Sequence, residues 1–593
     1  MKPGVAFPDF ISTEKVKRSR FSDGDSPKSS MRVYLLLVCI ILFPGLLLFK
    51  LIGLQLVEGN YYRLLSDSNR IRTTIVHAPR GVIFDRQGKP LVYNMPGFRI
   101  KEDNKTVQLT SGQALPLLAK GKQVEVDSLR QYPQASHLAH VLGYIGQITE
   151  EELKQPAFST YRIDDIVGKM GIEQSYESVL RGVDGKQLSE VDATGKIVRK
   201  LGQTDPTPGE NITLSIDSKL HDAAYAGLKD IKKGAVIVST PKGELLALVS
   251  KPSFDPNLFT LGKHYSPTGE TAYKTISEIL LDGDNQPLLN RAITGVYPPG
   301  STFKLITAVA GLEDKKIDAQ YEIEDTGILR VGEFSFANWY YLQYGGKEGS
   351  VNVVKAIKRS NDIFFYHLAG LLGVEKISLF AKQYGLGQQV GIDIFGEAKG
   401  LVPSPDWKKE IIGEGWYLGD TYHYGIGQGY VLTTPLQVNI WTQGIANGGI
   451  VYKPHLLKDA QPEILKKNVL IKKNLELIRQ GMIESCSPTG VAWPLFEFKV
   501  KNEKLKIDGK NILEVKQSTM SASFKDYRQI TVACKTGTAQ HGGEKDLPHA
   551  WITLWAPAYN PEIIVTVLAE SSGEGSSIAG PVAKRVLESW FTK

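Results

Sequence analysis

The 593-residue sequence predicts an α+β multi-domain protein with three parts. An N-terminal apolar stretch is long enough for a transmembrane helix, and a β-rich middle region follows it. A large C-terminal domain begins near residue 208, where strand, helix and hairpin patterns predict an antiparallel sheet covered by helices. A chain of this length exceeds one ordinary hydrophobic core, so several folded units are expected.

The transmembrane prediction rests on residues 33–57, which are apolar except for Lys50 and Gln55. A helix of this length crosses a hydrocarbon core of roughly 30 Å, and such helices tolerate the Pro44–Gly45 pair. A cleaved signal peptide would have a shorter apolar core and a small-residue cleavage site. Basic residues precede the span and predict a cytoplasmic tail at 1–32, with the rest of this single-pass chain outside the cytoplasmic membrane; they are Lys15, Lys17, Arg18, Arg20, Lys28 and Arg32.

The middle region, residues 58–207, reads as a non-catalytic domain. Residues 71–94 alternate β-branched and polar residues around a turn, which predicts a strand and a hairpin. Thr149 is a candidate N-cap, and residues 168–185 predict a helix closed by Gly182. The turn-rich residues 203–210 then mark a domain boundary.

The domain at residues 208–593 starts with a strand and a helix capped at Asp217 or Ser218. Residues 234–250 follow, and they predict two strands joined by a Pro-Lys-Gly turn. These elements precede a helix with a serine at its N-terminus, as expected for a sheet covered by helices.

Composition argues against several classes of protein. Charged residues make up 22% of the chain and the formal net charge is +7, without a basic stripe that interleaves with aromatics. This pattern predicts solvated surface and no nucleic-acid partner. The three cysteines form no CxxC and no Cys/His cluster, so we predict no metal and no cofactor. Cys486 and Cys534 could pair in an oxidising compartment, but their sequence positions do not decide it.

The first candidate motif is Ser301 with Lys304, at SxxK spacing on a predicted helix that follows Pro298-Pro299-Gly300. Residues three apart share a helix face, which places the amine beside the hydroxyl. A lysine can act as the base for a serine nucleophile if burial lowers its pKa toward neutrality. The spacing alone is weak evidence, because it recurs at Ser12–Lys15 and Ser239–Lys242. The former pair is predicted to be cytoplasmic and the latter straddles a turn.

Two further motifs strengthen the first. Ser360, Asn361 and Asp362 precede an aromatic helix, where the Ser360 hydroxyl could relay a proton or, alternatively, the segment could simply cap the helix. The run Lys535-Thr536-Gly537-Thr538 follows an apolar strand. A strand edge of this kind can pair with a peptide backbone and offer hydroxyls to a carboxylate, although a strand running into a turn is the simpler reading.

The order SxxK, S-x-[ND], KTG within one domain is the signature of penicillin-recognising serine acyl-transferases. Around it, the chain resembles class B penicillin-binding proteins of the elongation type. The resemblance spans almost the whole exported part and is carried by residues 80–94, 139–146, 168–182, 234–259, 285–304, 416–437 and 549–558. It implies a β-rich pedestal (dimerisation-type) domain with a short head at 58–207, and a penicillin-binding transpeptidase domain at 208–593.

The resemblance also implies roles for the motif residues. Ser301 would be the acylated nucleophile and Lys304 its base, while Ser360 and Asp362 would relay protons. Lys535, Thr536, Gly537 and Thr538 would form the wall that binds the substrate carboxylate, with the N–H groups of Ser301 and Thr538 as the oxyanion hole. An Asp at position 362 is typical of the elongation type, because division-type relatives usually have Asn there.

Three departures from the family pattern stand out. Cys534 replaces the usual Gly before Lys535, which places a side chain near the cleft or permits a bond to Cys486. Some relatives bind zinc through Asp, Asp, His and Cys between the first two motifs. Here Asp325 matches the first ligand, but Asn338 and Asn361 stand in for two others, so we predict no zinc. The segment between Asn94 and His137 is short for a head subdomain.

The implied function is a peptidoglycan D,D-transpeptidase of the cytoplasmic membrane that is acylated by β-lactams and has a possible carboxypeptidase side activity. Its implied partners are D-Ala-D-Ala stem peptides and a RodA-type SEDS glycosyltransferase. A membrane-anchored β-lactam sensor or lactamase-related protein is one alternative, and a catalytically inactive scaffold of the wall-synthesis complex is another. A bifunctional enzyme would need a polymerase domain before the pedestal, for which the chain has no room.

Overall fold

The computed structural model describes residues 30–592 except 103–104, 193, 195, 262–264, 268–271, 502–505, 508–509, 512–526 and 544–545. The chain forms two compact units. One unit contains the residues up to Ile75 together with Lys186–Thr204, and the other contains Val76–Gly185 and Asp205–Lys593. The catalytic motifs all belong to the second unit.

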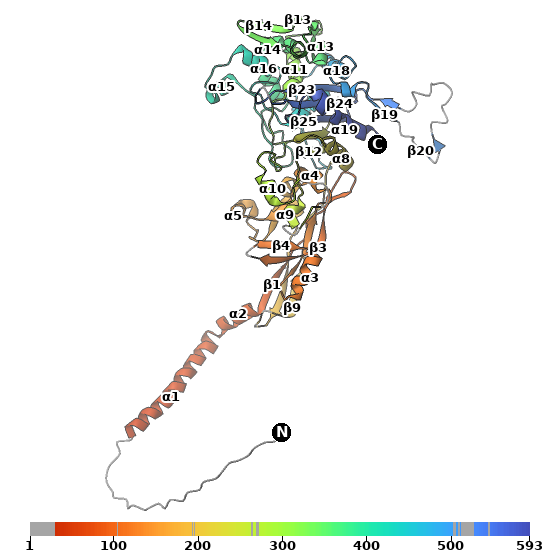
Figure 1. Cartoon of the computed structure of the whole chain (residues 1–593). Helices are drawn as coiled ribbons and strands as arrows, with labels where there is room; N and C mark the ends of the chain where they lie inside the picture. Colours follow the sequence, from red (N-terminus) through yellow and green to blue (C-terminus); the bar gives the residue numbers. More distant parts are fainter. Residues whose placement is uncertain are drawn as a thin grey trace, which may run out of the picture. The chain divides into compact units, whose positions relative to one another are not determined.

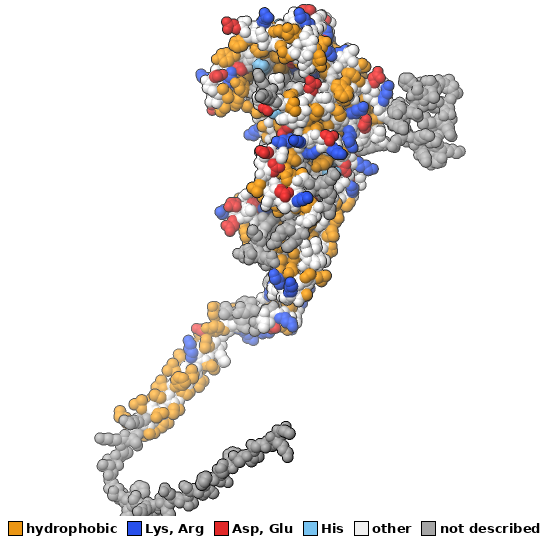
Figure 2. Space-filling model, in the orientation of Figure 1, with side chains coloured by type: hydrophobic (Ala, Val, Ile, Leu, Met, Phe, Trp, Pro, Cys, Tyr) orange, Lys and Arg blue, Asp and Glu red, His pale blue; other side chains and the backbone are white. Residues whose placement is uncertain are grey.

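The first unit contains the predicted membrane span. Helix α1 (Ser30–Ile52) continues through a π-helical turn, η1 (Gly53–Val57), and is followed by α2 (Gly59–Arg70). Within residues Val33–Val57, an 18-residue window has a mean hydropathy of 2.8, and none of that window is buried. Apolar side chains cover the visible face of α1 (Figure 2). The apolar surface therefore fits a lipid environment, while the predicted basic flank at 15–28 lies outside the described residues.

A three-stranded sheet completes the first unit. Its strand order is β1-β8-β9, in which β8 and β9 are antiparallel. An ion pair of 2.6 Å between Arg199 and Glu190 links these two strands. The strands are β1 (Ile71–Val76), β8 (Gly185–Val191) and β9 (Ile197–Thr204).

In the second unit, residues 76–185 belong to the region, residues 58–207, that the sequence predicts as the pedestal. Strand β3 (Pro90–Glu102) is its longest strand and pairs with β2, β4 and β5. The predicted hairpin after residue 80 is therefore β2 followed by β3. Strand β10 (Ile212–Thr213) joins this sheet by pairing parallel to β2. The other strands of the pedestal are β2 (Ile83–Phe84), β4 (Lys105–Leu109), β5 (Glu125–Gln131), β6 (Ile145–Gln147) and β7 (Ile166–Gly168).

The pedestal helices are short. Thr149 caps α5 (Glu150–Leu153) through a capping box with Glu152, as its sequence predicts. The helix predicted over residues 168–185 is instead two helices, α6 (Gly171–Ser175) and α7 (Glu177–Leu180), which are interrupted at Tyr176. The Tyr176 hydroxyl donates to Asp393, 3.1 Å away, so a tertiary contact holds the residue at this interruption. The remaining helices are α3 (Ser111–Ala119) and α4 (Ala135–Leu142).

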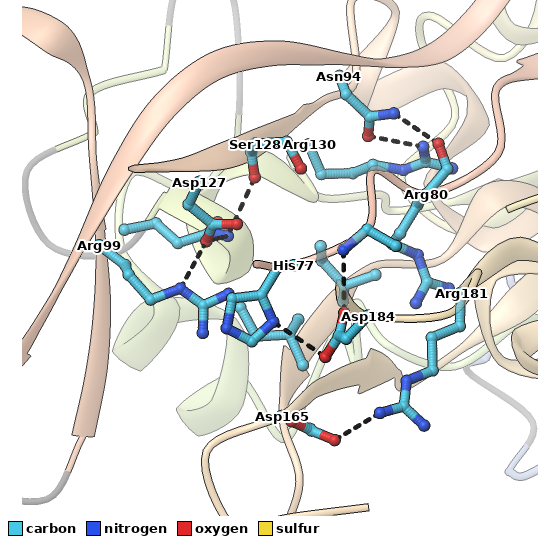
Figure 3. Close-up of a pocket in the computed structure, with 14 residues that line it drawn as sticks. His77, Arg80, Asn94, Arg99, Asp127, Ser128, Arg130, Asp165, Arg181 and Asp184 are labelled. Atoms are coloured by element: carbon cyan, nitrogen blue, oxygen red, sulfur yellow. Dashed lines mark hydrogen bonds and ion pairs between the residues drawn. The ribbon is translucent and has the colours of Figure 1, made fainter. Parts of the chain in front are cut away.

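Buried ion pairs tie the pedestal segments together. Glu173 is fully buried and contacts Arg80 at 2.9 Å and Arg130 at 2.7 Å. Beside this cluster is a small polar cavity of about 60 Å³, where His77 faces Asp184 and Arg181 faces Asp165 (Figure 3). Two sequence segments that are far apart, residues 80–94 and 168–182, thus meet in one network.

The part of the second unit that carries the three motifs is built on a five-stranded antiparallel sheet of order β12-β11-β25-β24-β23. Alternate residues of β11 face opposite sides, so Ile237 packs in one hydrophobic core and Val236 in the other. Both faces are covered, which explains why the strands read as nearly continuous apolar runs. The strands are β11 (Gly234–Ser239), β12 (Leu245–Lys251), β23 (Ala533–Ala539), β24 (His549–Ala556) and β25 (Ile563–Ala569).

Helices cover both faces of this sheet. On one side, α8 (Ser218–Gly227), capped by Asp217, packs with α19 (Gly580–Phe591). On the other side lie α17 (Pro435–Ala446) and the helical lobe that carries the first two motifs. The lobe comprises α11 (Lys304–Glu313), α12 (Trp339–Tyr344), α13 (Val353–Arg359), α14 (Asp362–Gln383), α15 (Pro405–Ile411), α16 (Leu418–Gly425) and α18 (Lys472–Ser485). Helices α9 (Asn257–Leu261) and α10 (Ile276–Leu281) lie apart from it, in a hydrophobic cluster with Ala139.

Short hairpins decorate the lobe. Strand β13 (Glu322–Asp325) pairs with β16 (Gly349–Asn352), and β14 (Ile328–Val331) pairs with β15 (Phe334–Ala337). These hairpins, α13 and α14 lie at the same end of the second unit (Figure 1). Helix α14 is long and apolar enough to span a membrane, but half of its apolar window is buried, so it is a core helix of this lobe.

Candidate active site

The first motif lies on the turn that enters α11. Ser301 belongs to a short 3-10 turn (Gly300–Thr302), and Gly300 has the left-handed φ of +53° that favours glycine. The indole N–H of Trp551 donates to the carbonyl of Pro298 at 3.1 Å, which ties the turn to the sheet. Ser301 is partly exposed, whereas Lys304 one turn later is fully buried. Solvent therefore reaches part of Ser301, while the amine of Lys304 is enclosed by protein.

The Lys304 amine is held by the second motif. Its Nζ donates to the carbonyl of Ser360 at 2.8 Å and to Oδ1 of Asp362 at 2.6 Å. Burial is the largest effect on the pKa of Lys304 and lowers it, while the negative charge of Asp362 opposes that shift. Because the net direction is downward, a larger fraction of this amine is neutral near pH 7 than in an exposed lysine.

In the second motif, different residues cap the helix and contact Lys535, a choice that the sequence leaves open. Ser360 ends α13 in the left-handed conformation, with φ 52° and ψ 39°, and Asn361 is the N-cap of α14. The Asn361 side chain accepts from the N–H of Phe364 at 2.8 Å. Because capping falls to Asn361, the hydroxyl of Ser360 is available to accept from Lys535 Nζ at 2.8 Å.

The third motif forms the edge of the sheet. Strand β23 carries Lys535, which is fully buried and also donates to the carbonyl of Thr536 at 2.9 Å. Burial, together with the nearby positive charge of Lys304, places the pKa of Lys535 well below the usual lysine value. Thr538 is exposed next to the turn of the nucleophile, since a Cβ on Gly300 would lie 3.0 Å from its carbonyl oxygen.

Four of the five residues with predicted chemical roles therefore converge: Lys304, Ser360, Asp362 and Lys535. Ser301 lies on the turn that leads into the helix of Lys304. Ser360 lies between the two lysines, with its carbonyl on Lys304 and its hydroxyl on Lys535. The SxxK pair Ser239–Lys242 does not join this group. Ser239 is fully buried at the end of β11, where its hydroxyl donates to Asn439. Ser12 lies outside the described residues.

The structure pairs Cys486 with Cys534 in a disulfide, which the sequence left undecided. Cys486 ends α18, and Cys534 directly precedes Lys535. The bond therefore fastens the strand of the third motif to a helix that packs against α13. Cys39, in the membrane span, is a free thiol.

The sequence did not predict the hydrogen bonds around Asp325. It only matched Asp325, Asn338 and Asn361 to the positions of zinc ligands in some relatives. This buried carboxylate accepts from the side-chain amides of Asn338 and Asn361. Both amides turn their NH₂ groups toward Asp325, and an NH₂ group of this kind is not a zinc ligand. Within the described ranges no three His, Cys, Asp or Glu side chains are grouped to hold a metal ion. The residues therefore do not fit the zinc site of some relatives.

The chain is similar to known proteins along most of its length. Residues 233–588 match the family model described as penicillin binding protein transpeptidase domain, and residues 117–214 match the penicillin-binding protein dimerisation domain. The chain is 32% identical to the peptidoglycan D,D-transpeptidase MrdA of Acinetobacter baumannii, over 94% of this chain and 86% of the relative.

Two solved structures are also similar to this chain. One is the complex between penicillin-binding protein PBP2 and MreC from Helicobacter pylori, with 27% identity and a TM-score of 0.71 over 88% of this chain and 99% of that one. The other is a peptidoglycan synthase complex described as coordinating polymerization and crosslinking, with 28% identity and a TM-score of 0.68 over 95% of this chain and 99% of that one.

Proposed function

This chain belongs to the penicillin-binding protein transpeptidase family and is a membrane-anchored peptidoglycan D,D-transpeptidase, and we propose that Ser301 is its acylated nucleophile. The observation that carries the proposal is the position of Ser360 between two buried lysines, Lys304 and Lys535, with Lys304 starting the helix that follows the turn of the partly exposed Ser301. Two buried amines around one serine have no evident use at an ordinary surface site. An acyl-transfer site does use such groups, because they accept and pass on protons.

In the first half-reaction, Ser301 Oγ attacks the penultimate D-Ala carbonyl of a pentapeptide stem. The neutral amine of Lys304 takes the hydroxyl proton as the C–O bond forms. The C–N bond then breaks, and the leaving D-Ala amine receives a proton passed through the Ser360 hydroxyl. The acyl-enzyme and free D-Ala are the products of this step.

In the second half-reaction, the amine of a neighbouring stem attacks the ester carbonyl. Its proton leaves by the same path, the C–O bond to Ser301 breaks and the serine regains its proton. The product is the cross-linked peptide. Water in place of that amine would give the carboxypeptidase side reaction. A β-lactam acylates the same serine, but its opened ring stays attached and blocks the acceptor.

We assign the edge strand β23 to substrate binding. An extended stem peptide can pair with this edge strand. Its terminal carboxylate would then face Thr536, Thr538 and the ammonium group of Lys535. Gly537 lets the strand approach the nucleophile turn, because a Cβ there would lie 3.1 Å from Thr302 Cγ2. The N–H groups of Ser301 and Thr538 would stabilise the oxyanion, a contribution typically worth about 2.7–4 kcal/mol for one such donor.

Partners and orientation follow from the same premise. We propose that the chain acts in cell elongation beside a RodA-type SEDS glycosyltransferase, with residues 1–32 in the cytoplasm and the catalytic domain, residues 208–593, outside the cytoplasmic membrane. Support comes from the solved complex of a relative with MreC and from the similar synthase complex that coordinates polymerization and crosslinking. The apolar span at Val33–Val57 supplies the anchor.

The test is covalent labelling of the full-length protein in detergent by a fluorescent penicillin, with mass spectrometry to locate the adduct. We expect a stable adduct on Ser301 that is absent in Ser301→Ala. The adduct should be kept in Ser239→Ala, which changes the serine of the other SxxK pair, Ser239–Lys242. Rapid turnover of the drug would favour a lactamase-related protein. A folded wild-type protein without label would favour the inactive scaffold.

A further inference from the structure

Asp325 is a buried carboxylate in the helical lobe that the reaction scheme does not use. It ends β13, is 1% exposed and accepts three hydrogen bonds. Oδ2 accepts from the side-chain amides of Asn338 at 2.7 Å and Asn361 at 2.6 Å, and Oδ1 accepts from the N–H of Gly327 at 2.6 Å. Burying a charge is costly unless it is well bonded, so these three donors must offset a substantial desolvation cost.

Both asparagines that Asp325 holds reach the start of α14 with their other end. Asn338 Oδ1 accepts from the N–H of Asp362 at 3.2 Å, and Asn361 Oδ1 accepts from the N–H of Phe364 at 2.8 Å. A carboxylate can only accept, so it forces each amide to present its NH₂ to Asp325 and its oxygen to the helix. Asp325 therefore fixes the orientation of both caps.

The helix start that is fixed in this way carries the acceptors of the catalytic amine. Ser360 and Asp362 flank Asn361, and both accept from Lys304 Nζ. Asn338 is also followed directly by Trp339, whose backbone N–H donates to Oδ2 of Asp362 at 2.9 Å. Through the two amides, Asp325 thus positions the backbone N–H of Asp362. It also positions Trp339, whose N–H orients the Asp362 side chain.

From this geometry we propose that Asp325 is a positioning residue for acyl transfer, which holds Ser360 and Asp362 in register with Lys304 through Asn338 and Asn361. The proposal rests on the function proposed above. Asp325 touches neither Ser301 nor Lys304. Its effect on the reaction passes through the two asparagines, which occupy the region where some relatives use a metal.

The experiment measures the acylation rate constant of the full-length protein with fluorescent penicillin as a function of pH. Asp325→Asn keeps the size of the side chain but turns an NH₂ group toward the donor on Oδ1 or the two donors on Oδ2. We expect acylation to slow by on the order of 10–100-fold, the scale of a small misplacement of reacting groups. We also expect the acid limb of the profile to move to lower pH, because Asp362 is less well placed to stabilise the ammonium of Lys304.

A double variant separates positioning from general support of the fold. If Asp325 acts through Asp362, Asp325→Asn combined with Asp362→Asn should be no slower than the slower single variant. The matched control is Asp318→Asn, an exposed aspartate that accepts from the N–H groups of Gln320 and Tyr321. It should leave both the rate and the pH profile unchanged.

Several outcomes would decide against the proposal. A folded Asp325→Asn protein with a lower melting temperature but an unchanged rate and pH profile would show a structural role only and overturn it. If that variant does not fold, Asn338→Ala cuts the single bond to the N–H of Asp362, and an unchanged rate in it would equally overturn the proposal. Absence of label on Ser301 in the wild-type protein would instead refute the proposed function itself.

Discussion

Lys304 and Asp362 form a buried ion pair at the bottom of the active site, with 2.6 Å between Nζ and Oδ1. Burial lowers the pKa of Lys304, and the carboxylate of Asp362 raises it in part again. The two effects together set the pH at which the amine becomes a competent base.

We therefore predict that Asp362→Asn moves the acid limb of the acylation profile to lower pH. Removing the negative charge leaves the ammonium form of Lys304 without its counter-charge, so the amine loses its proton at lower pH. The plateau rate should fall, because the amine also loses a partner that orients it. Acylation rates between about pH 5 and 9 would check this, and a shift to higher pH would contradict the assignment of Lys304 as base.

Gly537→Ala should slow acylation while the protein stays folded. An added Cβ would lie 3.1 Å from both Thr302 Cγ2 and Trp551 Cβ, so β23 must move away from the turn that holds Ser301. We expect a loss of about 10-fold or more in the acylation rate constant. Gly283→Ala is the control, since no atom lies within 4 Å of its added Cβ. Equal rates in both variants would argue against close packing at the nucleophile.

Reduction of the disulfide between Cys486 and Cys534 should destabilise the protein. The bond closes a loop with a sequence separation of 48 residues, for which the chain-entropy relation gives about 4 kcal/mol. We expect a thiol reductant to lower the melting temperature of the wild-type protein but not that of the Cys486→Ala/Cys534→Ala double variant. An equal response of the two proteins would show that the cysteines are not bonded in solution.

Glu173→Gln should be strongly destabilising in the pedestal. The change removes the carboxylate that Arg80 and Arg130 share in a fully buried site, which leaves the charge of Arg130 without a carboxylate and that of Arg80 with Glu177 alone. Breaking such a pair typically costs about 3–5 kcal/mol. The matched control is Glu463→Gln in the exposed pair with Lys453, where the cost should be below about 1 kcal/mol. Thermal unfolding of both variants checks the difference, and similar melting temperatures would contradict it.

Much of the fold could be predicted from local pattern. Continuous apolar runs at 234–239 and 245–251 became the buried strands β11 and β12, and the capping residues Thr149 and Asp217 begin helices where their chemistry favours it. The helix predicted from residue 168 and closed by Gly182 is interrupted at Tyr176, whose hydroxyl donates to Asp393, 217 positions away in the chain. No local periodicity reports such a contact.

The sequence by itself identified the apolar span and the three ordered motifs, and it predicted the site residues and their chemical class, because these are local signals. Tertiary structure alone decided that Asn361 rather than Ser360 caps α14, that Cys486 bonds to Cys534, and that Asp325 holds two asparagines behind the catalytic pair. The physical reason is that hydrogen-bond partners and burial are set by chain segments that meet only after folding, and burial in turn sets the pKa values of Lys304 and Lys535.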